Sequence, residues 1–250
     1  MTAVTFCDAW FVGHLGNQAL ASLALVFPFQ ALMQMMAGGA IGGGITSAVA
    51  RAKGSGNINS AKTIAFNGLL IGILMSLLYT IILGVFSVYI FNLLSDSNDV
   101  INDAVKYSKV AFGGAILTWV FFAFSSILRG LGDTYAPAKA IIIAGLIQII
   151  LSGLFTLGHV DIVNLGVTGP ATAMIVSHTL AVFFLLPKII GSNSLLSAQN
   201  CVFNWSAIYT ILKVGGLGLL NSLTIALTVV VITAFVADFG IDALAGYGLG

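Results

Sequence analysis

The sequence contains no glutamate, and charged residues make up only 7% of the chain. Hydrophobic residues make up 59%, and the mean hydropathy is +1.09. So little polar surface cannot cover a folded chain in water, which excludes a water-soluble monomer and indicates lipid as the solvent. The formal net charge of +1 argues against the basic surface that a nucleic-acid-binding protein needs.

Cysteine is also scarce, because the chain has only Cys7 and Cys201, in unrelated sequence contexts. The simplest interpretation is that both are structural thiols. The chain has no CxxC pair, no Cys/His spacing typical of a metal site and no phosphate-binding GxxxxGK[ST] loop. It also has no nucleophile motif or acidic pair within an apolar segment. We therefore expect no cofactor, no metal and no enzymatic activity.

The few charged residues divide the sequence into long uncharged, apolar runs. A bilayer core is crossed by about 20 helical residues, and the runs are continuous rather than alternating, which favours helices over barrel strands. The runs cover Ala9–Ala50, Thr63–Ser95, Val110–Leu128, Ala140–Val160, Ile162–Pro187 and Val214–Ala237. Because the first run holds the end of one helix and all of the next, the sequence predicts an all-α, polytopic membrane protein whose chain enters the bilayer seven times.

The first predicted span is short. Met1–Val12 gives about 18 Å of helix, against about 30 Å of hydrocarbon. This stretch also lacks the basic n-region and small-residue cleavage site of a signal peptide. At the other end, Gly250 falls where an eighth helix begins. We expect the chain to be a fragment, or the product of a split gene.

Basic residues divide unequally between the two sets of loops. The even-numbered loops hold Arg51, Lys53, Lys62, Arg129, Lys139, Lys188 and Lys213, whereas the odd-numbered loops hold Lys106 and Lys109. The odd-numbered loops also carry Asp96, Asp99, Asp103, Asp161, Asp238 and Asp242. The positive-inside rule then places the even-numbered loops and the N-terminus in the cytoplasm of a multi-pass protein of the cell membrane.

Two stretches of the chain resemble each other. Phe11–Leu25 and Phe235–Leu249 share seven of fifteen residues, and both end an apolar run, turn on a glycine and restart on Ala-Leu-Ala. They lie six spans apart and so run in the same sense, which is typical of parallel repeats in transporters. The polar stretch between Lys188 and Trp205 is interpreted as a linker between the two repeated parts.

The second helix, about Ala19 to Ala50, carries Pro28, which should kink it, and a glycine cluster within Gly38–Gly44. Small residues at this spacing favour close helix packing. A bending or sliding surface used in transport is the alternative interpretation.

Asp8 is the only acidic residue inside a predicted span. A carboxylate costs several kcal/mol in hydrocarbon, so a residue of this kind is usually functional. An aspartate that is neutral when buried and charged when wetted can couple a proton or a bound cation to a conformational change. The alternative is a solvated, structural residue near the outer interface.

Other polar residues lie within the predicted spans. Gln148 and Ser152 are four apart on one face of the fifth helix, which suits either hydrogen bonding between helices or contact with a substrate or ion. His178, inside the sixth helix, is either a hydrogen-bonded interior residue or a proton carrier. Asn221 is expected to be the main interior polar group of the seventh helix and, like His178, a proton or substrate contact.

Four stretches together resemble the MATE (multidrug and toxic compound extrusion) transporters, in order and over essentially the whole chain. They are Asp8-Ala-Trp-Phe-Val-Gly-His-Leu-Gly16 with Ala19-Leu20-Ala21, then Gly42–Gly56, then Leu128-Arg-Gly-Leu-Gly-Asp-Thr-Tyr-Ala-Pro137, and then Leu165-Gly-Val-Thr-Gly-Pro-Ala-Thr-Ala173. The resemblance implies twelve helices in two six-helix lobes. On that scheme residues 1–190 are the first lobe with a truncated first helix, 191–205 a cytoplasmic linker and 206–250 the start of the second lobe.

The resemblance also implies export of organic, often cationic or amphipathic, compounds in exchange for protons or sodium, with Asp8 in ion coupling and substrate release. The fifth helix departs from the pattern of proton-coupled members, because Gln148 and Ser152 stand where Asn and Asp are common. A lipid-linked precursor flippase of the same superfamily is a second hypothesis, and the absence of Lys or Arg from the middle of a span argues against it. A third is an inactive fragment that needs a partner chain to supply the second lobe.

Overall fold

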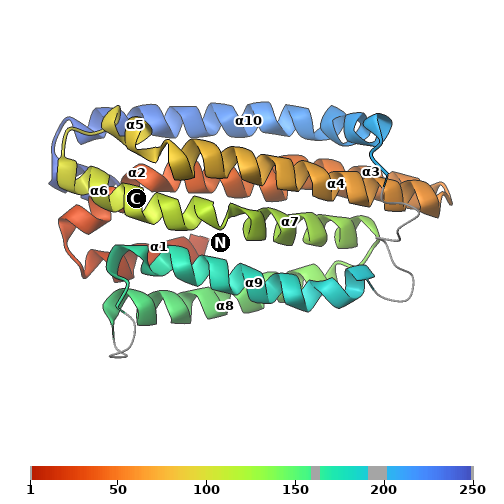
Figure 1. Cartoon of the computed structure of the whole chain (residues 1–250), viewed down its shortest axis with the longest axis horizontal. Helices are drawn as coiled ribbons and strands as arrows, with labels where there is room; N and C mark the ends of the chain where they lie inside the picture. Colours follow the sequence, from red (N-terminus) through yellow and green to blue (C-terminus); the bar gives the residue numbers. More distant parts are fainter. Residues whose placement is uncertain (1, 159–163, 191–201, 249–250) are drawn as a thin grey trace.

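The computed structural model describes residues 2–158, 164–190 and 202–248, and within these residues it is all-helical. The helices run along the long axis of the molecule (Figure 1). In chain order they are α1 (Thr2–Gly13), α2 (Asn17–Gln34), the π-helix η1 (Met35–Ala40), α3 (Ile41–Gly54), α4 (Ile58–Tyr79), the π-helix η2 (Thr80–Val85), α5 (Ser87–Asn92), α6 (Asn98–Gly113), α7 (Ala115–Gly130), α8 (Tyr135–Leu157), the 3-10 helix η3 (Gly166–Thr168), α9 (Gly169–Ile190), α10 (Trp205–Ala237) and α11 (Ile241–Tyr247).

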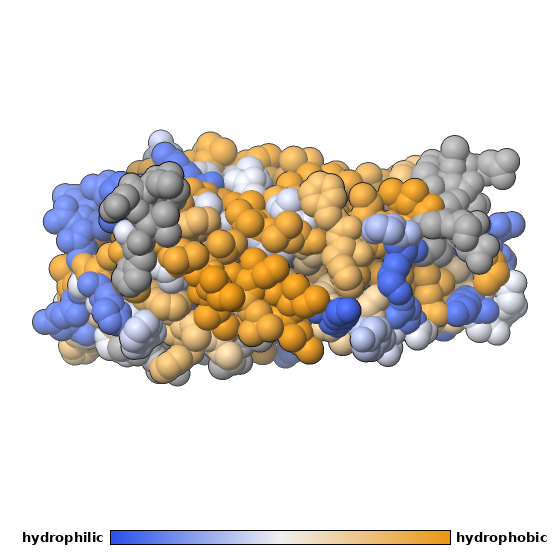
Figure 2. Space-filling view, turned by 90° about the horizontal axis from the view of Figure 1, so that it is seen from below, coloured by the Kyte–Doolittle hydropathy of each residue, from blue (hydrophilic) through white to orange (hydrophobic). Residues whose placement is uncertain are grey.

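The prediction of a polytopic membrane protein is confirmed. Five helical segments are long and apolar enough to span a bilayer, and the bent pair α6–α7 makes a sixth. The short α1 precedes them. On the face formed by α8 and α9, apolar side chains cover the middle of the molecule and hydrophilic ones gather mostly towards the two ends (Figure 2).

The two sets of loops lie at opposite ends of the bundle, as the charge pattern predicts. At one end, here called the basic end, Lys53 bonds to the carbonyl of Leu131 and Lys188 pairs with Asp133 at 3.0 Å. These contacts join the end of α3, the α7–α8 turn and the end of α9. At the other end, the acidic end, Gln18 donates to Asp103 at 3.0 Å.

The fourth predicted span differs from its apolar run, Val110–Leu128. It begins at Asn98, because Val100, Ile101 and Val105 form a buried face that extends α6 beyond that run. It then bends by 44° between α6 and α7, at Gly114, rather than running straight. The segments α2, η1 and α3 continue past Pro28 as one candidate span, with Pro28 inside α2, and the kink expected at Pro28 stays a prediction.

The third and sixth helices are also less regular than expected. The third turns into the π-helix η2 and breaks before α5 instead of continuing through the whole Thr63–Ser95 run. The sixth begins as the 3-10 turn η3, where Gly166 has a φ of +52°, and becomes α-helical only at Gly169. Gly169 packs so closely on α8 that an added Cβ would lie 2.5 Å from the Thr156 hydroxyl, which explains the small residue at this start.

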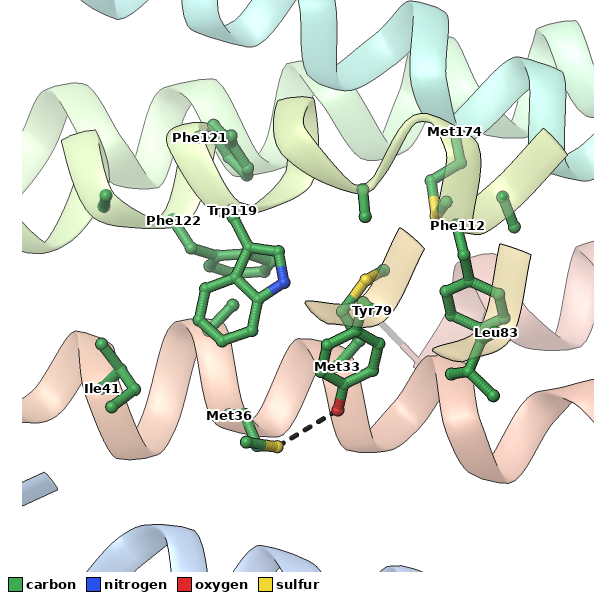
Figure 3. Close-up of a cluster of buried hydrophobic side chains, with 14 of the residues drawn as sticks. Met33, Met36, Ile41, Tyr79, Leu83, Phe112, Trp119, Phe121, Phe122 and Met174 are labelled. Carbon is green, nitrogen blue, oxygen red and sulfur yellow. Dashed lines mark hydrogen bonds between the residues drawn. The ribbon is translucent and has the colours of Figure 1, made fainter. Parts of the chain in front are cut away.

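The core joins α2, η1, α4 and α7. Met33, Met36, Tyr79 and Trp119 point towards one another, and the Tyr79 hydroxyl lies 3.1 Å from the Met36 sulfur (Figure 3). Trp119 and Met33 are almost completely buried. Flexible methionines fill the space between these rings, which suits an irregular interface between π-helical and α-helical segments.

The glycine cluster of the second span is a packing surface. A Cβ added to Gly44 would lie 2.4 Å from the carbonyl oxygen of Ile211 in α10, and one added to Gly215 would lie 2.9 Å from that of Ala40. The backbones of α3 and α10 therefore approach each other through glycine on both sides.

The start of α10 is held by a side-chain amide from α4. Asn67 is fully buried; its Nδ2 donates to the carbonyl of Val202 at 3.0 Å and its Oδ1 accepts from the backbone N–H of Asn204 at 3.0 Å. Asn204 in turn caps α10 by accepting from Ala207 N–H. The rest of the expected linker lies outside the described residues.

The sequence repeat is also a repeat of backbone structure. Gly16 has φ 111° and ψ 169°, and Gly240 has φ 101° and ψ 175°. The turn bonds correspond as well: Gly16 N–H to Gly13 O matches Gly240 N–H to Ala237 O, at 3.2 and 3.1 Å. The two turns are therefore the same supersecondary unit at an offset of 224 residues.

Candidate functional site

Asp8 lies on the inner face of α1. Its exposed fraction is 3%, and Val12, one helical turn further on, is fully buried. Phe6 and Trp10 point outwards from the same helix and are more than half exposed. The burial of Asp8 contradicts the alternative in which this residue is solvated, whereas its role in ion coupling stays a prediction.

Gln148 from α8 is the side chain that pairs with Asp8. Its Nε2 donates to Asp8 Oδ2 at 3.1 Å. Ser152, one turn along, is buried beside the same carboxylate, but its hydroxyl does not reach hydrogen-bond geometry. The face of α8 with these two residues points inwards, while Ile142, Leu146 and Ile150 are exposed. An apolar exterior with polar residues inside is the arrangement expected in lipid.

The carboxylate borders a cavity of about 500 Å³. Residues of α1, α2, η1, α7, α8 and α9 line it. Aromatic and apolar walls are supplied by Phe27, Met35 and Phe122, and the π-helix brings Gly38 and Gly39 to the surface of the cavity. π-helical turns are frequent at functional sites, because the extra residue widens a helix locally.

Gln30 is a polar residue of this cavity that the sequence analysis missed. Its Oε1 accepts from the hydroxyl of Tyr107 at 3.0 Å, and its Nε2 lies 3.2 Å from the sulfur of Met174. Gln30 thus links α2 to α6 and α9. Gln34, one turn further along the same span, also lines the cavity.

His178 is a hydrogen-bonded interior residue that also reaches the cavity. It is 2% exposed, its Nδ1 lies 3.0 Å from the Thr118 hydroxyl, and its ring stacks on Phe121 with centroids 5.1 Å apart. The role left open in the sequence analysis therefore stays a prediction, because these contacts suit either alternative.

Arg129, interpreted from sequence as a loop residue, lies in the last turn of α7 and lines the same cavity. One guanidinium nitrogen donates to the Ser126 hydroxyl at 3.0 Å, while its Nε is buried without a hydrogen-bond partner. Two charged residues that line this cavity, Arg129 and Asp8, thus each have one buried polar atom without a hydrogen-bond partner: Nε in Arg129 and Oδ1 in Asp8.

Asn221 does not belong to this site. It is exposed on α10, and the buried polar residue there is its neighbour Ser222, which bonds to Gly218 O at 2.9 Å. The expectation that Asn221 is the main interior group of this helix was wrong, because the inward stripe of α10 is set by Gly215, Ser222 and Ala226.

Among the described residues, no group of three or more His, Cys, Asp or Glu side chains gathers as a metal site. What the fold and cavity define is a polytopic helical membrane protein with a buried carboxylate beside a cavity between its helices. The MatE family model matches residues 1–154, and the chain belongs to that family.

Two relatives are identical to this chain at about a quarter of the aligned residues. It is 26% identical over 241 residues to the Probable multidrug resistance protein YoeA of Bacillus subtilis, covering 94% of this chain and 52% of that protein. It is 27% identical over 258 residues to the FAD transporter of Shewanella oneidensis, covering 100% of this chain and 56% of that one. The chain thus spans about half the length of the relatives it matches.

Solved structures show the same fold. An inward-facing multidrug resistance MATE family transporter superposes with a TM-score of 0.89 at 22% identity, covering 99% of this chain and 56% of that one. A transporter from Pyrococcus furiosus, described as having a binding pocket of reverse polarity, superposes with a TM-score of 0.81 at 22% identity, covering 99% and 61%.

Proposed function

We propose that the chain forms the ion-coupling part of a multidrug exporter of the cell membrane. Organic, often cationic, compounds leave in exchange for protons or sodium, and Asp8 binds the coupling ion and releases the substrate. The observation that supports this most is the unpartnered Oδ1 of a nearly fully buried carboxylate at the wall of a cavity. A buried acceptor without a partner is costly, and a proton, a metal cation or a cationic ligand removes that cost.

The walls of the cavity suit the proposed substrates. Phe27 and Phe122 offer apolar rings, whereas Gln30, Gln34 and Gln148 offer amides. A mixed surface of this kind takes amphipathic molecules, because a few polar groups fix the orientation and apolar contacts supply affinity. Gln148 holds the carboxylate through its hydrogen bond, and both Gln148 and the neighbouring Ser152 are proposed as auxiliary ion or substrate contacts.

Binding tests the site apart from transport. We expect a fluorescent organic cation to bind the purified chain and Asp8→Asn to weaken it about tenfold, since the isosteric amide keeps the shape and removes the charge. Asp96→Asn makes the same change in charge at an exposed position of the acidic end. Equal affinity in wild type and Asp8→Asn would remove Asp8 from the proposal.

In liposomes, dye efflux under a proton or sodium gradient then tests whether the chain transports alone or needs a partner chain that supplies a second lobe.

A lipid-linked precursor flippase is the second candidate, and Arg129 favours it. The sequence argument against a flippase was that no Lys or Arg lies mid-span, yet the cavity extends far enough to include this residue. A guanidinium recognises phosphate well. Arg129→Gln should weaken binding of a polyprenyl phosphate without affecting the cationic dye. If Arg129→Gln instead weakens binding of the cationic dye and leaves binding of the polyprenyl phosphate unchanged, the exporter is supported.

We also propose that the basic end and the N-terminus face the cytoplasm. In a chain with Cys7 and Cys201 replaced by serine, Ser55→Cys reports on the basic end and Asp96→Cys on the acidic end. In intact cells a membrane-impermeant maleimide should label only Asp96→Cys, and the opposite labelling reverses the orientation.

A further inference from the structure

A second cavity, of about 520 Å³, lies between α3 and α10 at the basic end. It is lined by Arg51, Tyr209, Thr210, Lys213, Val214 and Leu217. Arg51 comes from the last turn of α3 and the other five residues come from α10. This cavity is separate from the one beside Asp8 and shares no residue with it.

The two cations of this cavity have no acidic partner among the described residues. The two ion pairs found there join Lys106 to Asp103 and Lys188 to Asp133. Arg51 bonds only to Ser47 of its own helix, at 2.6 Å, and both Arg51 and Lys213 are exposed. Two positive charges from two helices therefore converge on one hollow without neutralisation.

The surroundings place this hollow at headgroup depth. Trp205 and Tyr209 are 70% and 62% exposed, and aromatic rings of this kind gather at the membrane–water interface. Lys213 lies eight residues into α10, about 12 Å from its start, a distance from which a lysine side chain is long enough to bring its amine back towards the interface. Beyond it, Leu217 is 75% exposed, so an apolar surface continues from the cavity along α10.

We propose that the Arg51–Lys213 cavity binds the phosphate headgroup of an anionic phospholipid, with an acyl chain along Val214 and Leu217. Basic pockets between membrane helices are suited to such headgroups. The apolar continuation favours a bilayer lipid over free phosphate, because a soluble anion gains nothing from exposed Val and Leu. The bound lipid would bridge α3 and α10, whose backbones meet nearby through Gly44 and Ile211.

Native mass spectrometry of the purified chain tests the proposal, with phosphatidylglycerol and phosphatidylcholine as probes. Wild type should retain phosphatidylglycerol in preference to phosphatidylcholine. Arg51→Gln and Lys213→Gln should each weaken phosphatidylglycerol binding about fivefold, and the double variant about thirtyfold. Lys139→Gln is the matched control, since Lys139 is an exposed cation near the start of α8, over the Phe184 ring.

Equal retention of the two lipids by wild type, or an equal loss in Lys139→Gln, overturns the proposal. Displacement of phosphatidylglycerol by millimolar inorganic phosphate indicates a soluble-anion site and overturns it too. Circular dichroism and elution volume check the fold of each variant. If the double variant aggregates, the two single variants carry the same test against Lys139→Gln.

Discussion

The side-chain amide of Asn17 donates a hydrogen bond of 2.9 Å to the carboxylate of Asp242, a residue 225 positions later. The bond joins the first residue of α2 to the first turn of α11, so the two copies of the repeated turn touch at the acidic end. Behind it, Gly248 packs against Ala24, where an added Cβ would lie 2.7 Å from the alanine methyl.

Removing this bond should loosen the acidic end slightly. We expect the double-mutant cycle of Asn17→Ala and Asp242→Ala to give a coupling of about 0.5–1 kcal/mol, because both side chains are exposed to screening. The measurement is denaturant unfolding of the four proteins in detergent micelles. Additive effects of the two substitutions would show that the bond contributes nothing.

The close approach of α3 and α10 predicts a large difference between adjacent glycines. Gly44→Ala should cost about 1–3 kcal/mol, because its Cβ meets a backbone oxygen that cannot move without shifting α10. Gly43→Ala is the control: nothing lies within 4 Å of its Cβ, and alanine favours the helix. Thermal unfolding in detergent should rank Gly44→Ala well below wild type and Gly43→Ala at or above it. Similar melting temperatures for both variants would contradict the packing.

Gln148, which bonds to Asp8, should contribute more to the free energy of unfolding than Ser152, which lies beside it. Gln148→Leu keeps a similar volume and removes the donor to the carboxylate, so we expect a loss of about 1–3 kcal/mol in the free energy of unfolding. Ser152→Ala removes a hydroxyl that makes no hydrogen bond, and we expect less than about 1 kcal/mol. The same unfolding assay compares them, and an equal loss in both would show that the Gln148 bond is not the stronger restraint.

At the basic end, Asp133 predicts a pH dependence on the acid side. The backbone N–H of Ala136 and the amine of Lys188 hold the pKa of the Asp133 carboxyl below its usual value of 3.8. A carboxyl whose folded pKa is depressed stabilises the fold above its unfolded pKa, and this contribution is lost as pH falls through the folded value. Wild type should therefore exceed Asp133→Asn in stability by a constant amount above about pH 5, and the gap should narrow below about pH 4.

Asparagine still accepts a hydrogen bond from Ala136, so this comparison isolates the charge of Asp133 from its capping role. Melting temperatures of the two proteins between pH 3 and pH 7 provide the measurement. A gap that does not change with pH would assign the whole effect to capping.

Much of the fold was predictable because lipid imposes a simple rule. Apolar runs of sufficient length became spans, and the division of basic residues placed alternate loops at the same end. Irregularities within spans were not predictable: the bend at Gly114 and the π-helix at Met35–Ala40 depend on which neighbours pack there, and an apolar run looks the same in either case.

The site was predicted in part, for a similar reason. Asp8 and Gln148 were found because a polar residue in hydrocarbon needs a partner, but Gln30 and Gln34 were passed over inside a long apolar run. They are four residues apart, the spacing that singled out Gln148 and Ser152, so the signal was present. Arg129 was assigned to a loop because a charge at the end of a run does not show that a cavity reaches it.

The matched turns at Gly16 and Gly240 both require a residue with a positive φ. Each needs a backbone angle that side chains with a Cβ adopt only under strain, at φ 111° and 101°. A residue such as valine at either position would misdirect the helix that follows, α2 in one case and α11 in the other. Because α2 and α11 pack against each other, a misdirected helix after either turn disrupts the same α2–α11 interface. The second copy of the turn therefore cannot compensate for a defect in the first.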